Sequence, residues 1–508
     1  IIHVNINAPS GGDGATWGTS YTYLQDALDA ATYGDEIWVA KGVYYPDEGG
    51  NVTDGDRDAV FNLKEGVAIY GGFAGGETSR GQRDWDANVT VLSGDIDKND
   101  FNADGVVNDA ADINGANSFR VVYGSGLTKT AVLDGFSITA GLAAKCPPGY
   151  PASVDPLVSD GAGIRMTDAS PVLANLVIVG NRADSPACAI GGGGLSNAGN
   201  GSPQLRNVTV RNNFRNINGG GMSLQGGPVL VNVRVINNRM KSFFGPGGIT
   251  GIGGGGIVAT GSPQLYNVQI IGNETDSSGG GILFIGAKPI VTNVEIRGNR
   301  ARNAGGLKSD FSDVPLNNVL IAGNSATRAD GASFLYGSAI LENVTIADNA
   351  GVGLVFYGTG TLDPDQYVIR NSIIWGNQPV DTVGTFNEVT ILSAAATASY
   401  SLLPPVTPTV GSPDKPWTDG GGNPAYQDPR FLAPGDASSA PTSEGDYRLQ
   451  VNSVAIDTGD NTGMPANAID LAGYSRIYNG TVDMGAYESQ IVCPAAGTTR
   501  LYVDATPA

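Results

Sequence analysis

The chain has 508 residues, a formal charge of −20 and only 15% charged residues, while glycine occupies 75 positions. So acidic a composition excludes a general affinity for nucleic-acid phosphates and disfavours an anionic membrane surface. No apolar run approaches the roughly 18 residues that a membrane-spanning helix needs. An acidic surface with little lysine suits an extracellular protein and divalent cations.

Residues 1–35 are predicted to form an opening strand and a short capping helix. Within 20–31, apolar residues such as Leu24, Ala27 and Leu28 recur on one helical face. A strand-like stretch, EIWVAKGVYYP, follows. Such a cap is needed because the first coil of a stacked repeat leaves a sheet edge and a core open.

Residues 36–160 are predicted to form irregular first coils that carry an acidic loop. The spacing of Asp100, Asn102, Asp104 and Gly105 in DFNADGVVN is similar to an EF-hand or dockerin calcium loop, although its twelfth position is an alanine. Clustered oxygen ligands favour Ca²⁺ over transition metals. The alternative is an acidic, solvated turn. The expected ligands are Asp95, Asp97, Asp100, Asn102, Asp104, Val106, Asn108 and Asp112.

Residues 161–380 contain eight asparagine pairs, six residues apart, each flanking an apolar stretch such as NVTVRNN. Successive pairs are 25 to 35 residues apart, and glycine-led stretches such as GGGI lie between them. A constant core with variable spacers predicts a stacked repeat whose insertions form loops. The predicted ladder is Asn175/Asn181, Asn207/Asn213, Asn232/Asn238, Asn267/Asn273, Asn293/Asn299, Asn318/Asn324, Asn343/Asn349 and Asn371/Asn377.

The pattern within each repeat predicts strands with one buried face. Val208 and Val210, or Val294 and Ile296, alternate with polar residues and should point inward. The asparagines are expected at the corners of the coils, where their amides would hydrogen-bond along the stack. Glycines would permit bends or left-handed backbone at a second corner.

These motifs resemble those of known β-helical proteins. The helix and the strand after it resemble the N-terminal cap of right-handed parallel β-helix proteins of the pectin-lyase-like superfamily. The GGG[ILM] and [VI]xxN motifs resemble repeats of chlamydial polymorphic outer-membrane proteins. The resemblance implies an all-β fold, a right-handed parallel β-helix solenoid with a short N-terminal capping helix, in a secreted bacterial protein of the cell surface.

Residues 381–492 contain DPRF, GDYRL, SVAIDTGD and VDMGAYE. They resemble the C-terminal segment of surface β-helix proteins with interchangeable anchors, and we expect them to finish the last coils. Residues 493–508 end in LYVDATPA, which matches IHVNINAP near the N-terminus. A tandem protein, a polymer that donates a strand to its neighbour, and chance all account for this echo. The expected assembly residues are His3, Val4, Asn5, Leu501, Tyr502, Val503 and Asp504.

The three cysteines do not form a disulfide framework. Cys146 and Cys188 follow equivalent repeat positions, so stacked loops could bring them together in a disulfide. Two free thiols are the alternative. A disulfide would imply an oxidising compartment.

Catalytic signatures are sparse. The single histidine, His3, is expected to be an exposed strand residue, which leaves no histidine for a serine or cysteine nucleophile. The Gly-His-Gly segment of polygalacturonase-like enzymes is absent from the sequence. Pectate lyases use an arginine or lysine base, for which the candidates are Arg206, Arg211, Arg234, Arg297 and Lys308, although each is expected to be a solvated outward residue.

The leading hypothesis is an extracellular structural protein, a rigid calcium-stabilised module of a stalk, sheath or fibre that assembles end to end, and not an enzyme. Self-association or tandem modules would supply its partners. The alternative is a polysaccharide-binding adhesin or a lyase-like enzyme on the same scaffold. Tyr266, Tyr336, Tyr357 and Trp375 could then stack on sugars, although we expect them to fill corners.

Overall fold

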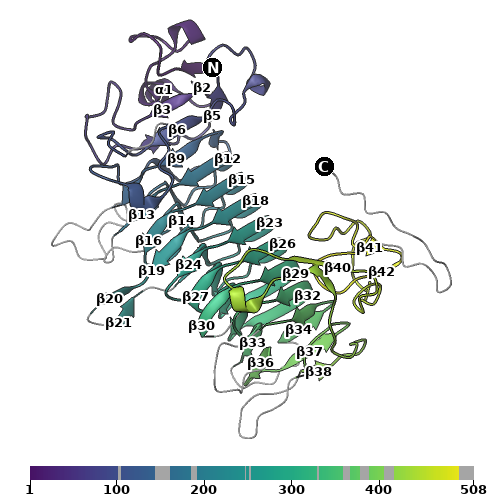
Figure 1. Cartoon of the computed structure of the whole chain (residues 1–508). Coiled ribbons are helices and arrows are strands. Elements are labelled where there is room, and N and C mark those ends of the chain that lie inside the picture. The colour runs from purple at the N-terminus through teal and green to yellow at the C-terminus, as the bar shows by residue number, and fades with distance from the viewer. Residues whose placement is uncertain are drawn as a thin grey trace.

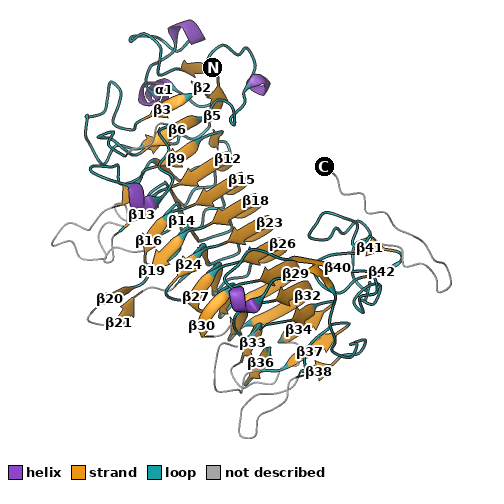
Figure 2. Ribbon diagram, in the orientation of Figure 1, coloured by secondary structure: helices purple, strands orange, loops and turns teal. Residues whose placement is uncertain are grey.

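Stacked strands form a rod that starts at the N-terminus, and the C-terminal segment, drawn in yellow, lies beside its later coils (Figure 1). Nearly all the regular structure is strand (Figure 2). The computed structural model describes residues 1–100, 104–143, 161–184, 191–245, 248–250, 253–328, 331–358, 366–377, 388–405 and 417–490. The predicted site residues Asn102, Cys146, Cys188, Leu501, Tyr502, Val503 and Asp504 lie outside these ranges.

Long sheets run along the rod, and neighbouring strands in each come from successive coils and pair in parallel. Within the described residues, the largest sheet has 18 strands: β1 Ile2–Val4, β2 Glu36–Ala40, β3 Gly42–Tyr44, β5 Ala68–Phe73, β6 Thr90–Ser93, β8 Val132–Asp134, β9 Ser137–Thr139, β12 Val172–Val179, β15 Gln204–Arg211, β18 Val229–Ile236, β23 Gln264–Ile271, β26 Ile290–Arg297, β29 Asp313–Ala322, β32 Ser338–Ala347, β34 Tyr367–Arg370, β35 Ile373–Trp375, β37 Ala396–Ser399 and β38 Thr418–Asp419.

The second sheet has 11 strands: β4 Phe61–Asn62, β7 Val122–Ser125, β11 Ile164–Thr167, β14 Leu195–Ala198, β17 Met222–Leu224, β22 Ile257–Ala259, β25 Ile282–Ile285, β28 Leu307–Asp310, β31 Ala332–Leu335, β33 Leu354–Tyr357 and β36 Val389–Leu392. The third has 7: β10 Leu142–Ala143, β13 Arg182–Ala183, β16 Phe214–Asn216, β19 Arg239–Lys241, β24 Glu274–Thr275, β27 Arg300–Asn303 and β30 Ser325–Arg328. The predicted all-β, parallel β-helix is confirmed.

Short elements project from the coils or close them. The antiparallel pairs are β20 Phe243–Gly245 with β21 Gly248–Thr250, β39 Phe431–Ala433 with β40 Asp446–Leu449, and β41 Ile477–Tyr478 with β42 Thr481–Val482. The 3₁₀ turns are η1 Trp17–Thr19, η2 Arg80–Gln82, η3 Ala110–Asp112 and η4 Ala437–Ser439.

The core is a set of columns of identical or similar side chains. Leu205 pairs with Leu230, and Leu230 with Leu265, in successive strands of the largest sheet. All three are at most 1% exposed. The predicted inward residues Val208, Val210, Val294 and Ile296 are buried as well. Because these leucines are buried, replacing any one of them by alanine should lower the free energy of unfolding by about 2–5 kcal/mol.

The N-terminal end is closed by α1 (Leu24–Ala30), which packs against β1, β2 and β4. Strand β1 is also bonded on its outer edge, because the amide of His3 donates to Gly14 O at 2.8 Å and that of Tyr21 to His3 O at 2.9 Å. The expectation that His3 is exposed is wrong. Its ring is half-buried, 4.7 Å from Trp17 and 5.9 Å from Trp38, because the cap covers it.

The second asparagine of each pair lies just after a strand of the largest sheet, and in the first six pairs a strand of the third sheet follows it. Its side chain is buried, at most 3% exposed. In Asn299, the backbone N and Nδ2 both donate to Asn324 Oδ1 at 2.9 Å, and Nδ2 also donates to Ile270 O at 2.9 Å. Each coil thus satisfies the polar groups of the next. These corner asparagines are Asn181, Asn213, Asn238, Asn273, Asn299, Asn324, Asn349 and Asn377.

The corner row differs from the predicted ladder at its two ends, where no asparagine is available as a partner. Asn181 Oδ1 accepts from the amide of Gly141 at 3.0 Å in the coil before it. Asn377, at the other end, donates from its backbone N and Nδ2 to Glu388 Oε2 at 3.0 and 3.2 Å. A glycine amide and a glutamate carboxylate therefore terminate the row, because a buried amide needs a partner of some kind.

Glycine is required beside the corner row. A Cβ at Gly281 would lie 3.1 Å from Asn299 Nδ2 and 2.7 Å from a carbonyl oxygen, and one at Gly331 would lie 2.7 Å from Asn349 Nδ2. Any larger residue would push the asparagine away from its partner. The GGGI-type stretches of the sequence therefore make room for the buried amides.

The first asparagine of each pair is not at a corner, which corrects the prediction. These asparagines lie inside or beside strands of the largest sheet with φ between +47° and +56°, and asparagine tolerates this left-handed backbone better than most residues. They form a second row, in which Asn267 Nδ2, for example, donates to Asn232 Oδ1 at 3.2 Å. This outward row is hydrogen-bonded through Asn175, Asn207, Asn232, Asn267, Asn293 and Asn318. Asn343 and Asn371 share its backbone conformation, but Asn371 Nδ2 donates to Asp460 O at 2.9 Å instead.

The C-terminal segment first adds β36, β37 and β38 to the last coils, and from about residue 431 it folds back over the outward face of the largest sheet. Outward Leu320 and Ala322 of β29 pack against Phe431, Tyr447 and Met484 of this segment. The expectation of further coils holds for β36, β37 and β38 and is wrong for the residues after them, which cover outward positions that are apolar in β29.

Replacing Asn299 by alanine should lower the free energy of unfolding by about 3 kcal/mol, because the buried donors of the preceding coil lose their acceptor. Chemical denaturation monitored by circular dichroism measures this loss. The control is Asn200→Ala, an exposed asparagine whose backbone amide rather than its side chain bonds Asp168. Equal effects of the two changes would contradict the role of the corner ladder.

Candidate functional site

The predicted acidic loop holds its carboxylates with amide groups. Asp95 Oδ2 accepts from the backbone amide of Asp100 at 3.0 Å, and Asp97 Oδ2 accepts from that of Ala116 at 2.7 Å. Asp100 Oδ2 accepts from Asn117 Nδ2 at 2.7 Å. These carboxylates therefore hold the two ends of the loop together.

The other predicted ligands make separate contacts and do not bond to Asp95, Asp97 or Asp100. Asp104 Oδ1 accepts from the amide of Val106 at 3.1 Å, as in an Asx turn. Asn108 Oδ1 accepts from Arg211 Nη2 at 3.0 Å, and Asp112 is exposed in η3. The side chain of Asn108 is thus directed to the β-helix rather than to a loop centre.

Burial raises the pKa of Asp95 to about 6, and burial also raises the pKa of Asp100. Among the described residues, no three His, Cys, Asp or Glu side chains are grouped so that they could hold a metal ion. Two buried carboxylates supply fewer than the six to eight oxygens of a calcium site. Calcium binding at this loop stays a prediction.

The two asparagine rows differ in what they can contact. The corner asparagines are closed off from solvent, so they serve the fold and offer nothing to a ligand. The outward row is accessible at several positions. The buried set comprises Asn181, Asn213, Asn238, Asn273, Asn299, Asn324, Asn349 and Asn377.

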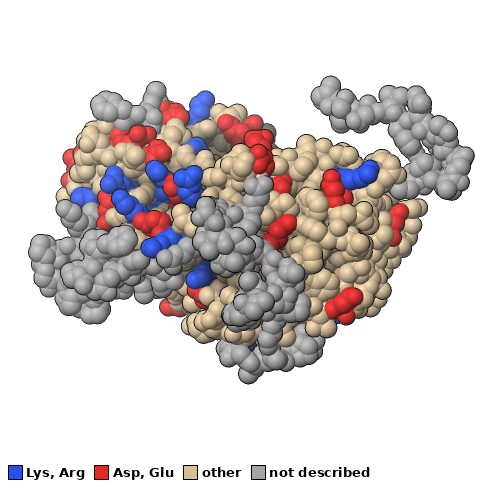
Figure 3. All heavy atoms as spheres, turned by 60° about the horizontal axis from the view of Figure 1, so that its bottom comes forward, with Lys and Arg blue, Asp and Glu red and all other residues tan. Residues whose placement is uncertain are grey.

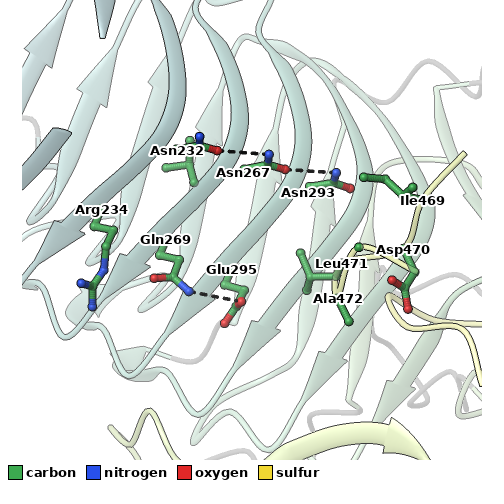
Figure 4. Close-up of a pocket in the computed structure, with 12 residues that line it drawn as sticks. Asn232, Arg234, Asn267, Gln269, Asn293, Glu295, Ile469, Asp470, Leu471 and Ala472 are labelled. Atoms are coloured by element: carbon green, nitrogen blue, oxygen red, sulfur yellow. Dashed lines mark hydrogen bonds between the residues drawn. The ribbon is translucent and has the colours of Figure 1, made fainter. Parts of the chain in front are cut away.

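A groove runs along the outward face of the largest sheet, beside residues 463–473 of the C-terminal segment (Figure 4). Its first part has a volume of about 390 Å³. Asn232, Asn267 and Asn293 line its floor on β18, β23 and β26, with Nδ2–Oδ1 distances of 3.2 Å between neighbours. Part of the outward asparagine row therefore forms the floor of this groove.

A second polar row lies beside the first. Arg234, Gln269 and Glu295 occupy matching positions on the same strands, and Gln269 Nε2 donates to Glu295 Oε1 at 3.4 Å. The two rows repeat every coil, at the spacing of about 4.8 Å between paired strands.

The wall of the groove is held by the carboxylate of Asp470, which accepts from the amides of Tyr474 and Glu488 at 2.7 and 2.8 Å. Asn318 Nδ2 donates to Ile469 O at 2.6 Å. This bond ties the wall to the floor between the first part of the groove and a second part of about 400 Å³. The second part is lined by residues that include Glu342, Asn343, Met464 and Arg476.

The groove offers amide donors and acceptors, the guanidinium groups of Arg234 and Arg476, and carboxylates, which suit hydrogen bonds to hydroxyl groups. Of the predicted lyase-type bases, only Arg234 lines it. The others have separate partners: Arg206 bonds Gln204, Arg211 bonds Asn108, Arg297 bonds Gly445 O, and Lys308 pairs with Asp310.

Sequence reasoning missed Gln269, Glu295 and the loop 463–473. The two outward residues alternate with buried ones in their strands, so the strand pattern alone could have placed them on the outer face. The loop gave no such signal, because its position depends on contacts with strands far away in the chain.

A family model described as a right-handed β-helix region matches residues 248–394, which agrees with the predicted handedness. No curated protein sequence matches the chain. Among solved structures, the pectate lyase Pel9A aligns with a TM-score of 0.38 and 14% identity, over 96% of each chain. A rhamnogalacturonan lyase aligns with a TM-score of 0.41 and 13% identity, over 89% of this chain and 96% of that one. Nothing about activity follows from these alignments.

In the part of the chain that the structure describes, no helix is long and apolar enough to cross a membrane.

The stability of the C-terminal segment should fall as pH rises. Burial, together with the charge of Asp483, raises the pKa of Glu488 to about 8, and burial raises that of Asp483 to about 6, from ordinary values of 4.5 and 3.8. The folded chain therefore binds more protons than the unfolded chain between about pH 4 and pH 8, so the free energy of unfolding decreases across that range. Calorimetry should give a higher Tm at about pH 5 than at about pH 8.5.

Glu488→Gln should flatten the decline above about pH 6, because it removes the group that titrates there. Glu444→Gln, which changes an exposed carboxylate, is the control. A Tm that rises with pH over this range would show that these carboxyl groups do not govern the stability.

Proposed function

We propose that the chain is an extracellular structural protein, a rigid β-helix module whose first coils are stabilised by calcium. The observation that carries this proposal is the unbroken coil-to-coil bonding of the largest sheet and of the corner asparagines. Because each coil supplies the hydrogen-bond partners of the next, bending or local opening would break many buried bonds together.

The N-terminal strand supports an end-to-end arrangement of such modules. Val4 is fully buried, and Ile2 packs against the core. Both edges of β1 are occupied within the chain. A strand of matching sequence, such as residues 501–508, would therefore have to replace β1 rather than add to it. Exchange between subunits and tandem repetition in one protein both satisfy this condition.

Negative-stain electron microscopy tests the exchange between subunits. We expect the purified chain to form end-to-end filaments in calcium and Val503→Asp to leave single rods with an unchanged Tm, because a charge cannot replace buried Val4. Thr498→Asp, just before the matching strand, should still form filaments. EDTA should lower the Tm, because an ion bound only to the folded state stabilises it. Dispersed rods in every condition would contradict the exchange, and an unchanged Tm would contradict calcium.

The groove favours a second candidate function, the binding of an extracellular polysaccharide without cleavage. Its two polar rows repeat along the rod, so they could contact successive sugars of one chain. Acidic and basic side chains intermingle on the face shown in Figure 3, and large areas of it carry no charge. This mixture of charges favours neither an acidic nor a basic polysaccharide as the ligand.

Affinity electrophoresis in gels that contain a polysaccharide tests this candidate. Met464→Trp should abolish retardation, because the larger side chain fills the second part of the groove. Ala466→Trp is the matched control, since Ala466 is exposed on the same loop and does not line the groove. Release of unsaturated uronate from acidic polysaccharides would instead show a lyase.

A further inference from the structure

Successive coils turn the same corner, from the second sheet toward the largest one, through a left-handed residue. The amide of Gly286 donates to Asp310 O at 2.9 Å, and that of Phe311 donates to Leu335 O at 2.8 Å. Gly286, Phe311 and Tyr336 therefore occupy equivalent positions, with φ of +55°, +53° and +59°.

Two of these positions carry bulky aromatic side chains on strained backbone. Glycine adopts left-handed φ without penalty, and Gly286 shows that it serves this corner. Phe311 and Tyr336 are nevertheless 65% and 37% exposed, so burial does not compensate the strain. Strained positions of this kind persist where the side chain has a function.

The rings form an exposed stack with one free end. Phe311 and Tyr336 stack with centroids 5.1 Å apart at 25°, and Tyr357 meets Tyr336 edge-on at 5.2 Å. The other face of Phe311 is turned to the coil of Gly286, where an added Cβ would meet nothing within 4 Å. The ring face of Phe311 on this side is therefore not covered by a side chain from the equivalent position of the preceding coil.

Two ion pairs lie on residues close in the chain to this corner. Lys308 Nζ lies 3.0 Å from Asp310 Oδ2 just before the corner, and Lys288 Nζ lies 3.6 Å from Asp313 Oδ2 just after it. Each pair presents donors and acceptors with no net charge. Hydroxyl groups, which both donate and accept, match such pairs better than a charged group does.

We propose that the open face of Phe311 binds a pyranose ring of a neutral polysaccharide. The polarised C–H bonds of the sugar pack on the negative ring face, and its hydroxyls bond the flanking lysine and aspartate side chains. A uronate would gain no net attraction from the paired lysine and aspartate charges, and its carboxylate would meet the negative ring face, which disfavours acidic sugars. The site lies outside the groove and does not depend on polysaccharide binding there.

Isothermal titration calorimetry with cellohexaose, mannohexaose, xylohexaose and hexagalacturonate tests the proposal on the full chain. We expect at least one neutral hexasaccharide to bind and the hexagalacturonate to bind at least tenfold more weakly. Phe311→Gly should weaken neutral binding at least tenfold with the Tm maintained, because glycine occupies the equivalent position in the preceding coil. Phe311→Tyr should retain binding.

The controls separate this site from the groove. Tyr33→Ala removes an aromatic residue that is 72% exposed in the N-terminal cap and should leave the affinity unchanged. Met464→Trp should leave it unchanged as well, whether or not the groove binds sugars. Binding that survives Phe311→Gly, a preference for hexagalacturonate, or Phe311-dependent binding of an oligolysine peptide without binding of neutral sugars would overturn the proposal.

Discussion

Amide hydrogen bonds between buried corner asparagines hold the coils in register, and the other features depend on that register. The donors and acceptors of an asparagine at a corner are satisfied mainly by the same residue one coil away and by the carbonyls between them. A buried amide without such a partner would cost about 1–3 kcal/mol, so a slip of one coil against its neighbour is strongly disfavoured. Fixed register aligns the inward leucines into columns and the outward polar residues into rows.

The outward rows show how one scaffold supports two kinds of surface. From β15 to β26 the matching outward positions are Thr209, Arg234, Gln269 and Glu295, and they remain open to solvent or to the groove. In β29 the same position is Leu320, which the C-terminal segment covers. The groove spans this change of polarity, because residues 463–473 of the covering segment lie beside the polar positions as well as beside β29 and β32.

Much of this architecture could be predicted from the sequence, since spacing is a local property. The glycine runs and the second asparagine of each pair indicated the corners, and the alternating valines indicated the core. The first asparagine was misplaced, because a left-handed residue inside a strand has the same spacing as one at a corner. The fold-back of the C-terminal segment could not be derived from that segment. The change from NVEIRGN to NVLIAGN makes an outward position apolar, and this indicates that another segment covers it.

The aromatic corner shows how a comparison between successive coils can reveal a residue with a function outside the fold. A left-handed position costs a residue with a Cβ roughly 1–2 kcal/mol. One stacked aromatic pair returns about 0.5–1.5 kcal/mol. The Phe311–Tyr336 stack and the edge-on Tyr336–Tyr357 contact together return about 1–3 kcal/mol, whereas two left-handed residues cost roughly 2–4 kcal/mol. In a unique loop this imbalance would be hard to recognise. In a solenoid the preceding coil provides the comparison, because Gly286 turns the same corner without strain, so the aromatic pair is best explained by a contact outside the fold.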